Sequence, residues 1–130
     1  MRKFLVSLLA LLGFGSNLLF ANPVIDRAYQ EKKSDIQVEG SGKVVKILAD
    51  DNNGSRHQRF ILKLHSNLTV LVSHNIDLSQ KVEDLKAGDE VLFFGEYEWN
   101  KQGGVIHWTH HDPRKKHKDG WLKHKGKIYQ

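Results

Sequence analysis

The sequence predicts an all-β fold, built as one small barrel domain. From residue 36 onward, short runs of alternating apolar and polar residues follow one another, which is typical of half-buried strands. Clusters of Gly, Asn and Asp separate these runs where turns are needed. The chain has 130 residues, enough for a single domain. A hydrophobic content of 39% with 27% charged residues fits a folded domain rather than a disordered segment.

The first 21 residues have the features of a secretory signal peptide. Arg2 and Lys3 precede an apolar run that starts at Phe4, and the stretch ends on the small residue Ala21. We expect cleavage after Ala21 and a periplasmic or secreted location, with no transmembrane segment in the mature chain. An uncleaved membrane anchor is the alternative, but polar and glycine residues interrupt the apolar run, namely Gly13, Gly15, Ser16 and Asn17.

The five predicted strands lie between residues 36 and 113. Residues 22–35 are polar and are expected to form a flexible lead-in with at most one helical turn. Gly40 and Gly42 allow a bulge or bend in the first strand. Ser66 and Asn67 form a tight connection, which predicts a hairpin between the second and third strands. The strands are expected at residues 38–48, 59–64, 68–72, 90–99 and 105–111, and Pro113 ends the last one.

The order of these strands matches the OB-fold. A single strand, a hairpin, an interruption at residues 75–86 and a second hairpin correspond to a five-stranded Greek-key barrel with a variable segment before the fourth strand. Residues 85–91 also look like the start of the fourth strand in OB domains. An open antiparallel sandwich is the alternative. Residues 114–130 are expected to be an irregular basic segment that packs on the barrel or trails from it.

Four motifs resemble a family of small exported bacterial proteins, the domain of unknown function 3465. They are Arg56–Phe60, His74–Asp77, Gly95–Asn100 and Gly103–Pro113. The resemblance covers residues 36–130, and its last motif is the most specific. It implies export and an OB-like barrel but no established activity. Function must therefore be argued from side chains, because a fold alone does not supply it.

Charge is unevenly distributed along the chain, although the net value is +5. Residues 22–100 carry 10 basic and 13 acidic side chains, whereas residues 101–130 carry 8 basic and 2 acidic ones and five of the eight histidines. The protein is thus a mildly acidic body with a cationic, histidine-rich end. The absence of cysteine excludes disulfide scaffolds, thiolate metal sites and cysteine nucleophiles. Phosphate-cradling and Gly-x-Ser-x-Gly motifs are also absent.

The most unusual stretch runs from His107 to Asp112. Imidazole and carboxylate groups bind zinc, copper or nickel. On an extended strand His107 and His111 would lie roughly 13 Å apart, too far to bind one ion. A site would need the chain to bend after Asp112, and under this hypothesis the ligands are His110, His111, Asp112 and His117. The alternative is that these histidines cap a strand end and hydrogen-bond locally.

A second candidate site combines the start of the second strand with the fifth. OB-folds bind oligonucleotides or oligosaccharides on strands two and three and the adjoining loops. A small anionic ligand could be held there by Arg56, His57, Arg59 and His107. His57 and Arg59 are also the catalytic candidates, as acid or base and as stabiliser of phosphate charge. The alternative is an exposed edge whose arginines pair with Asp50 and Asp51.

Glu96 and Glu98 share one strand face, opposite Tyr97 and Trp99. Either they are simply solvated, or one pairs with a histidine of the neighbouring fifth strand and helps to bind a metal. The lysine-rich tail, with Trp121 available for stacking, could bind polyanions in a salt-sensitive way. Specific nucleic-acid recognition is not expected, because a charge run is usually a solvated surface.

These observations favour an exported OB-like binding module that holds a metal ion or a small anionic ligand near the histidine-rich end of the fifth strand. A metal-dependent hydrolase, such as a phosphodiesterase or nuclease, is one alternative. A polyanion-binding or partner-binding structural or stress protein is another. The sequence does not indicate the oligomeric state.

Overall fold

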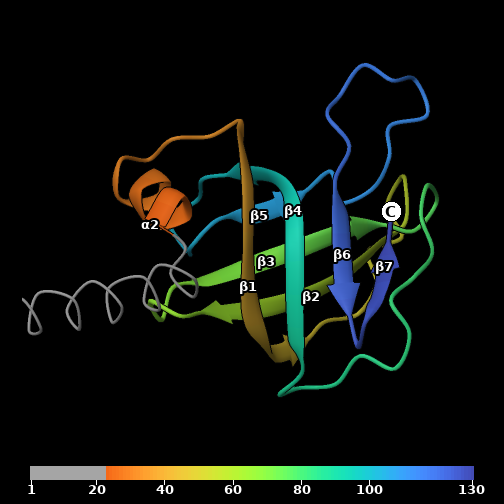
Figure 1. The fold of residues 1–130 in the computed structure, drawn as a ribbon, viewed down its shortest axis with the longest axis horizontal. Helices are drawn as coiled ribbons and strands as arrows, with labels where there is room; N and C mark the ends of the chain where they lie inside the picture. The colour runs from red at the N-terminus through yellow and green to blue at the C-terminus, as the bar shows by residue number, and fades with distance from the viewer. Residues whose placement is uncertain (1–22) are drawn as a thin grey trace, which may run out of the picture.

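Seven strands form one sheet that closes into a barrel in the computed structural model, which describes residues 23–130. The order is β1-β2-β3-β5-β4-β6-β7, and β1 also pairs with β4. That extra pairing closes the first five strands on themselves (Figure 1). The β3–β5 pair is parallel and the other pairs are antiparallel. The predicted five-stranded barrel is confirmed, whereas the predicted signal peptide lies outside the described residues.

The barrel strands begin and end close to their predicted positions, except β5. They are β1 (Ile36–Ile47), β2 (His57–Leu64), β3 (Thr69–Asn75), β4 (Glu90–Glu98) and β5 (Val105–His107). Alternate residues of β2, β3 and β4 point inward and form the core, as their alternation predicted. The largest buried side chains in the barrel are Phe60, Leu62, Phe93, Tyr97 and Ile106.

The long strand β1 bends and so pairs with both β2 and β4. Gly42 is in register with Leu64 of β2 and also with Val91 of β4. A Cβ atom at Gly42 would lie 3.0 Å from the Cβ of Leu62, so a side chain there would crowd the crossing. The register shift itself falls between Val44 and Lys46, beyond the two glycines that the sequence indicated.

The fifth strand is shorter than predicted. β5 ends at His107, because Trp108 has a φ of 58° and so leaves the extended conformation. The expectation of a strand to residue 111 is therefore wrong, and His107, Thr109 and His111 do not share a strand face. Instead, the chain turns into the barrel, where Thr109 and His110 are buried.

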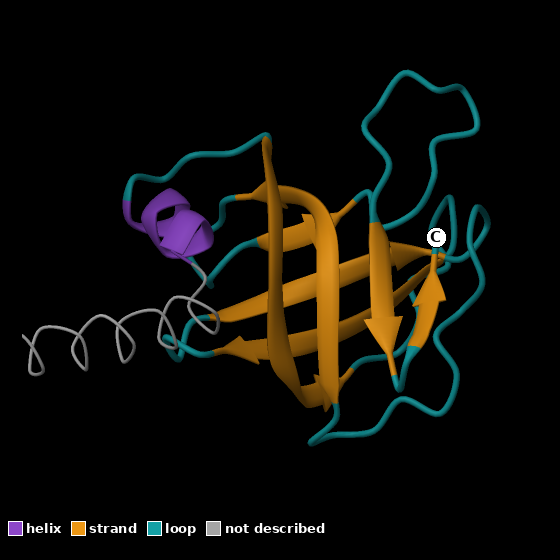
Figure 2. Ribbon diagram, in the orientation of Figure 1, coloured by secondary structure: helices purple, strands orange, loops and turns teal. Residues whose placement is uncertain are grey.

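The C-terminal segment is more regular than predicted. Residues 121–129 form a hairpin of β6 (Trp121–His124) and β7 (Lys127–Tyr129), and β6 extends the sheet from β4 (Figure 2). Leu122 and Tyr129 are buried and anchor it, whereas Ile128 remains exposed. The expectation that residues 114–130 are irregular is thus wrong for residues 121–129, whereas residues 114–120 belong to a loop.

A helix covers one end of the barrel. α2 (Pro23–Gln30) has eight residues, more than the single turn expected for the lead-in. Ile25 and Ala28 are buried in the core cluster, and Tyr29 stacks on Trp99 with ring centroids 6.5 Å apart. No helix within residues 23–130 is long and apolar enough to cross a membrane.

Candidate metal centre on the outer face of the barrel

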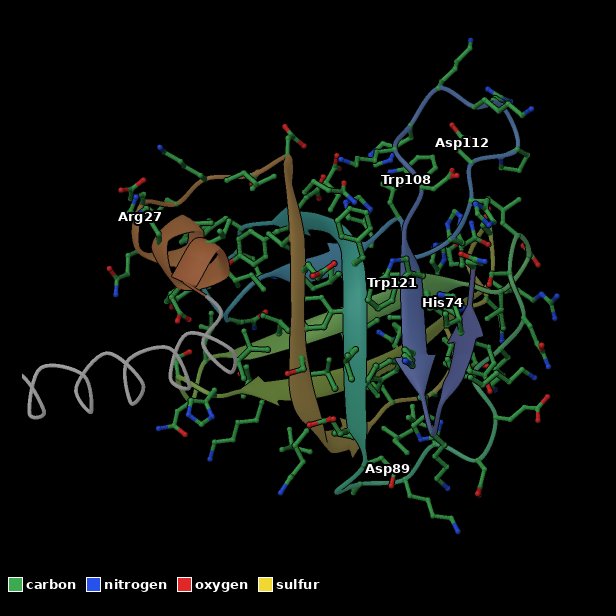
Figure 3. All side chains as sticks on the ribbon, viewed as in Figure 1. Arg27, His74, Asp89, Trp108, Asp112 and Trp121 are labelled. Carbon is green, nitrogen blue, oxygen red and sulfur yellow. The ribbon has the colours of Figure 1, made fainter. Side chains whose placement is uncertain are left out.

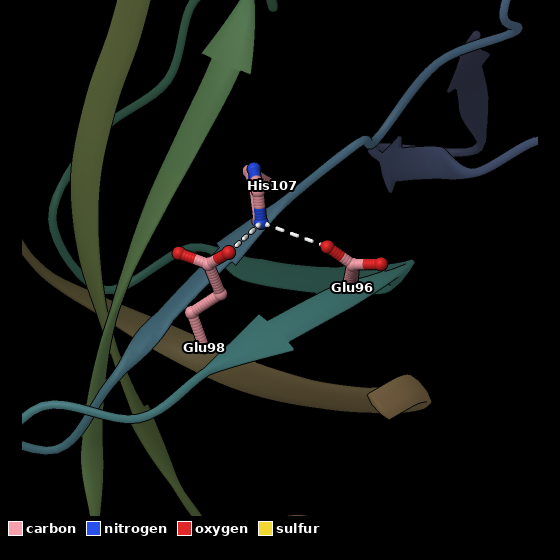
Figure 4. A group of neighbouring side chains, drawn as sticks. All are labelled: Glu96, Glu98 and His107. Atoms are coloured by element: carbon pink, nitrogen blue, oxygen red, sulfur yellow. Dashed lines mark ion pairs between the residues drawn. The ribbon is translucent and has the colours of Figure 1, made fainter. Parts of the chain in front are cut away.

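Antiparallel pairing of β4 and β5 gathers two carboxylates and an imidazole on the outer face of the barrel. Glu96 is in register with His107, and Glu98 is in register with Val105. Because residues two apart share a face, Glu98 also reaches His107 diagonally. The Nε2 atom of His107 lies 3.3 Å from Oε2 of Glu96 and 3.4 Å from Oε1 of Glu98 (Figure 4). Of the two alternatives for these glutamates, pairing with a histidine of the fifth strand is therefore the one observed.

The Nε2 atom of His107 is buried and has no hydrogen bond. Its two carboxylate neighbours are close, but their directions do not meet the geometry of a hydrogen bond. One ligand atom from each of the three side chains lies within 4.8 Å of the others. Within residues 23–130 this is the one group of three such side chains that converges so closely.

A second histidine contacts the same glutamate from the loop 108–120. Nε2 of His117 lies 2.9 Å from Oε1 of Glu96, and Nδ1 lies 2.8 Å from the carbonyl oxygen of Lys118. Both partners can only accept, so both ring nitrogens of His117 carry a proton and the ring is cationic. Burial lowers the pKa of His117, but the hydrogen bonds to Glu96 and Lys118 outweigh it and the pKa is raised. The ring also stacks on Trp108, with centroids 4.0 Å apart.

Asp112 organises this loop. Its carboxylate accepts hydrogen bonds from the backbone N–H groups of Arg114, Lys116 and His117 at 3.0, 3.0 and 2.8 Å. These bonds, first of all the one from His117, lower the pKa of Asp112. Trp108 and Asp112 lie together in the loop that leads to β6 (Figure 3). Asp112 therefore acts on the backbone, and through it places the ring of His117.

The four ligands suggested by the sequence do not converge. His111 bonds through Nδ1 to Asp119 at 2.8 Å, and His110 bonds through Nδ1 to the carbonyl oxygen of His111 at 2.8 Å. Asp112 is engaged with the backbone, and His117 with Glu96. The converging group described above contains none of these four residues. The geometry thus favours a metal set centred on His107.

The two arginines of the predicted anion site have structural partners. Nε of Arg56 lies 2.7 Å from Oδ1 of Asp77, and the backbone N–H of Arg56 bonds to the same carboxylate. Arg59 donates from Nε and Nη2 to the carbonyl oxygen of Ala49 at 3.1 and 2.9 Å. Pairing of the arginines was one expectation, but the partners are not Asp50 and Asp51.

His57 and His107, the other two residues of that predicted site, share a pocket of about 180 Å³. It opens on the outer face beside β2, β3 and β5. Its walls are His57, Ser73, Asn75, Leu78, His107, Trp108 and His110. Ser73 and Asn75 are not among the site residues predicted from the sequence. Strand alternation and the hairpin register could have indicated both residues. They occupy outward positions of β3 beside those of β2, and Asn75 lies directly opposite His57.

His74 ties β3 to the chain that follows β5. It is fully buried, and its ring bonds to Oγ1 of Thr109 at 2.7 Å and to the carbonyl oxygen of Gln80 at 3.0 Å. The Gln80 carbonyl can only accept, so Nε2 carries the proton and Nδ1 of the neutral ring accepts from the Thr109 hydroxyl. Burial lowers the pKa of His74 to about 4.

A family model described as "Protein of unknown function (DUF3465)" matches residues 8–130. The chain belongs to the DUF3465 family. The resemblance found in the four motifs is thereby confirmed and extends over nearly the whole chain. No curated protein matches the chain. Membership of DUF3465 brings no activity, so the function of this protein rests on the geometry of its side chains.

Proposed function

We propose that this DUF3465 protein is an exported binding module that holds a divalent transition-metal ion at Glu96, Glu98 and His107. The observation that carries the proposal is the buried Nε2 of His107, which lacks a hydrogen bond and faces two carboxylate oxygens at 3.3 and 3.4 Å. An imidazole nitrogen beside carboxylates suits zinc, copper or nickel. A bound cation would also relieve the repulsion between the two carboxylates.

Three protein ligands leave further coordination positions for water or another ligand. This arrangement is common in zinc sites that act on a bound molecule, whereas structural sites use four protein ligands. The cationic ring of His117 has no free lone pair, so it is not a ligand in this arrangement. Its hydrogen bond instead orients Glu96, as an outer-shell partner commonly does for a metal-binding carboxylate.

Export is supported by the N-terminal sequence, where two cations precede an apolar stretch that ends on Ala21. The lack of cysteine agrees with a site built from nitrogen and oxygen only. Both features fit a protein that meets metal ions outside the cytoplasm.

Titration calorimetry on protein purified without a histidine tag and stripped with a chelator tests the proposal. We expect one equivalent of Zn²⁺, Cu²⁺ or Ni²⁺ to bind, with Cu²⁺ binding most tightly. The variants E96Q, E98Q and H107Q keep the size of each side chain nearly unchanged and should each weaken binding at least about tenfold. E39Q, on the outer surface of β1, is the matched control and should bind like the wild type. Unchanged affinity in the E96Q/E98Q/H107Q triple variant would refute the site.

A further inference from the structure

The pocket beside the metal centre presents an unusual set of hydrogen-bonding groups. His57 belongs to β2, Ser73 and Asn75 belong to β3, and His110 follows β5. These four polar side chains surround about 180 Å³, with Trp108 and Leu78 as apolar walls and His107 at the side of the metal centre. None of the four is a ligand in the proposed metal set.

The two histidines of the pocket present lone pairs. Nδ1 of His57 lies 2.9 Å from the carbonyl oxygen of Ser55, and Nδ1 of His110 lies 2.8 Å from that of His111. A carbonyl oxygen only accepts, so each Nδ1 carries a proton, and Nε2 is the atom that offers a lone pair when the ring is neutral. His110 is 3% exposed, and burial lowers its pKa, which keeps the ring neutral near pH 7. Its Nε2 has no hydrogen bond to the described residues.

The other two side chains supply donors. Oδ1 of Asn75 accepts from the backbone N–H groups of Asp77 and Leu78 at 2.9 and 3.2 Å. This fixes the orientation of the amide, and Nδ2 is a donor that has no hydrogen bond to residues 23–130. The hydroxyl of Ser73 can donate or accept. The pocket therefore combines two acceptors with two donor groups.

This combination does not suit an anion or a second metal ion. Unprotonated Nε2 atoms repel an oxyanion, and the guanidinium groups of Arg56 and Arg59 are held by Asp77 and the Ala49 carbonyl. His57 and His110 do not belong to the group of converging metal-ligating atoms found within residues 23–130.

We propose that this pocket binds a saccharide through its hydroxyl groups. Each hydroxyl can donate to Nε2 of His57 or His110 and accept from Asn75 or Ser73, which matches the groups around the pocket. Pockets for drug-sized ligands hold about 300–1,000 Å³, so this smaller one fits a single sugar ring or the end of a longer glycan. It lies on the β2–β3 face, which other OB-folds use for oligosaccharides.

Imidazole ¹⁵N NMR on the metal-free protein provides the test. In the free protein we expect Nε2 of His57 and His110 to resonate as unprotonated nitrogens. Both signals and the side-chain amide of Asn75 should shift on addition of chitotriose or maltotriose, and less on addition of sodium phosphate. Protonated Nε2 atoms, no shift with either trisaccharide, or tighter binding of phosphate would each overturn the proposal.

Variants distinguish this pocket from the metal centre. N75D keeps an oxygen for the Asp77 and Leu78 N–H groups but removes the donor, and H57F removes an acceptor. Each should weaken saccharide binding about tenfold, the effect of losing one hydrogen bond to the ligand. H65F, at the far end of the β2–β3 hairpin, is the matched control. The E96Q/E98Q variant should lose the metal and keep the saccharide, so the two proposals can fail independently.

Discussion

Nε2 of His124 lies 2.8 Å from Oδ2 of Asp89, and the side chain of His124 is only 1% exposed. This contact joins the C-terminal hairpin to the start of β4, which is itself part of the barrel. The hydrogen bond from His124 is the largest of the effects that lower the pKa of Asp89. The basic tail is therefore attached to the barrel by a polar contact as well as by Leu122 and Tyr129.

Replacement of Asp89 by Ala should destabilise the protein. The change leaves Nε2 of the buried His124 without a partner, and an unsatisfied buried polar group costs about 1–3 kcal/mol. Urea unfolding measures the loss. The control is D84N, because Asp84 pairs with Lys125 on an exposed surface and Asn also tolerates the φ of 53° at this position, so the change should matter little. An equal loss of unfolding free energy in the two variants would show that the contact between Asp89 and His124 stabilises the protein no more than an exposed ion pair does.

Stability should fall on acidification because of His74. Its pKa is about 4 in the folded state and 6.5 ordinarily, so below pH 6.5 the unfolded state binds a proton that the folded state does not. The contribution is complete above pH 6.5 and is lost as the pH falls towards 4, by up to roughly 3 kcal/mol. Free energies of unfolding across this range, for wild type and H74L, measure it. An equally steep pH dependence in H74L would assign the effect to other groups.

Substitution of Gly95 by Ala should weaken metal binding although Gly95 is not a ligand. A Cβ atom there would lie 2.6 Å from the carbonyl oxygen of His107, so β5 must move and carry the His107 ring with it. We expect calorimetry to show at least a tenfold loss of metal affinity, because groups that position a metal ligand typically contribute about that much. G54A strains a turn with φ of 79° in open space and should leave the affinity unchanged. Wild-type affinity in G95A would contradict the assigned centre.

Removal of His117 should weaken the metal centre without abolishing it. The H117A variant loses the hydrogen bond that orients Glu96, and loss of such a partner typically costs about 10–100-fold in metal affinity. H107A should lose more, because it removes a ligand. The matched control is H111A, in the same loop, where the ring of His111 pairs with Asp119. Loss of binding in H111A with retention in H107A would instead support the ligand set suggested by the sequence.

Export should release a chain that begins at Asn22. The protein is produced with its own N-terminal segment in a Gram-negative host, and the periplasmic fraction is analysed by mass spectrometry. We expect the mass of residues 22–130, because the apolar stretch ends on the small residue Ala21. Full-length protein in the membrane fraction would support the uncleaved anchor instead.

The candidate centre could be predicted only in part from the sequence. The alternation in the fourth strand places Glu96 and Glu98 on one face. Pairing of one of them with a fifth-strand histidine was one of two interpretations of that motif. Which histidine they meet depends on register, and a shift of one residue would turn His107 to the other face. His117 arrives from a loop whose shape depends on Asp112 and on the stacking of Trp108, contacts that no local pattern encodes.

The sequence by itself determined the barrel, because inward and outward residues alternate in β2, β3 and β4, and alternation is a local property. Only the tertiary structure decided where β5 ends. Trp108 takes a left-handed backbone conformation, and Gly95 and Gly120 have no side chain to block the chain as it turns inward over them. That turn separates His107 from His110 and His111. One histidine therefore meets the glutamates, another faces the pocket, and the third pairs with Asp119.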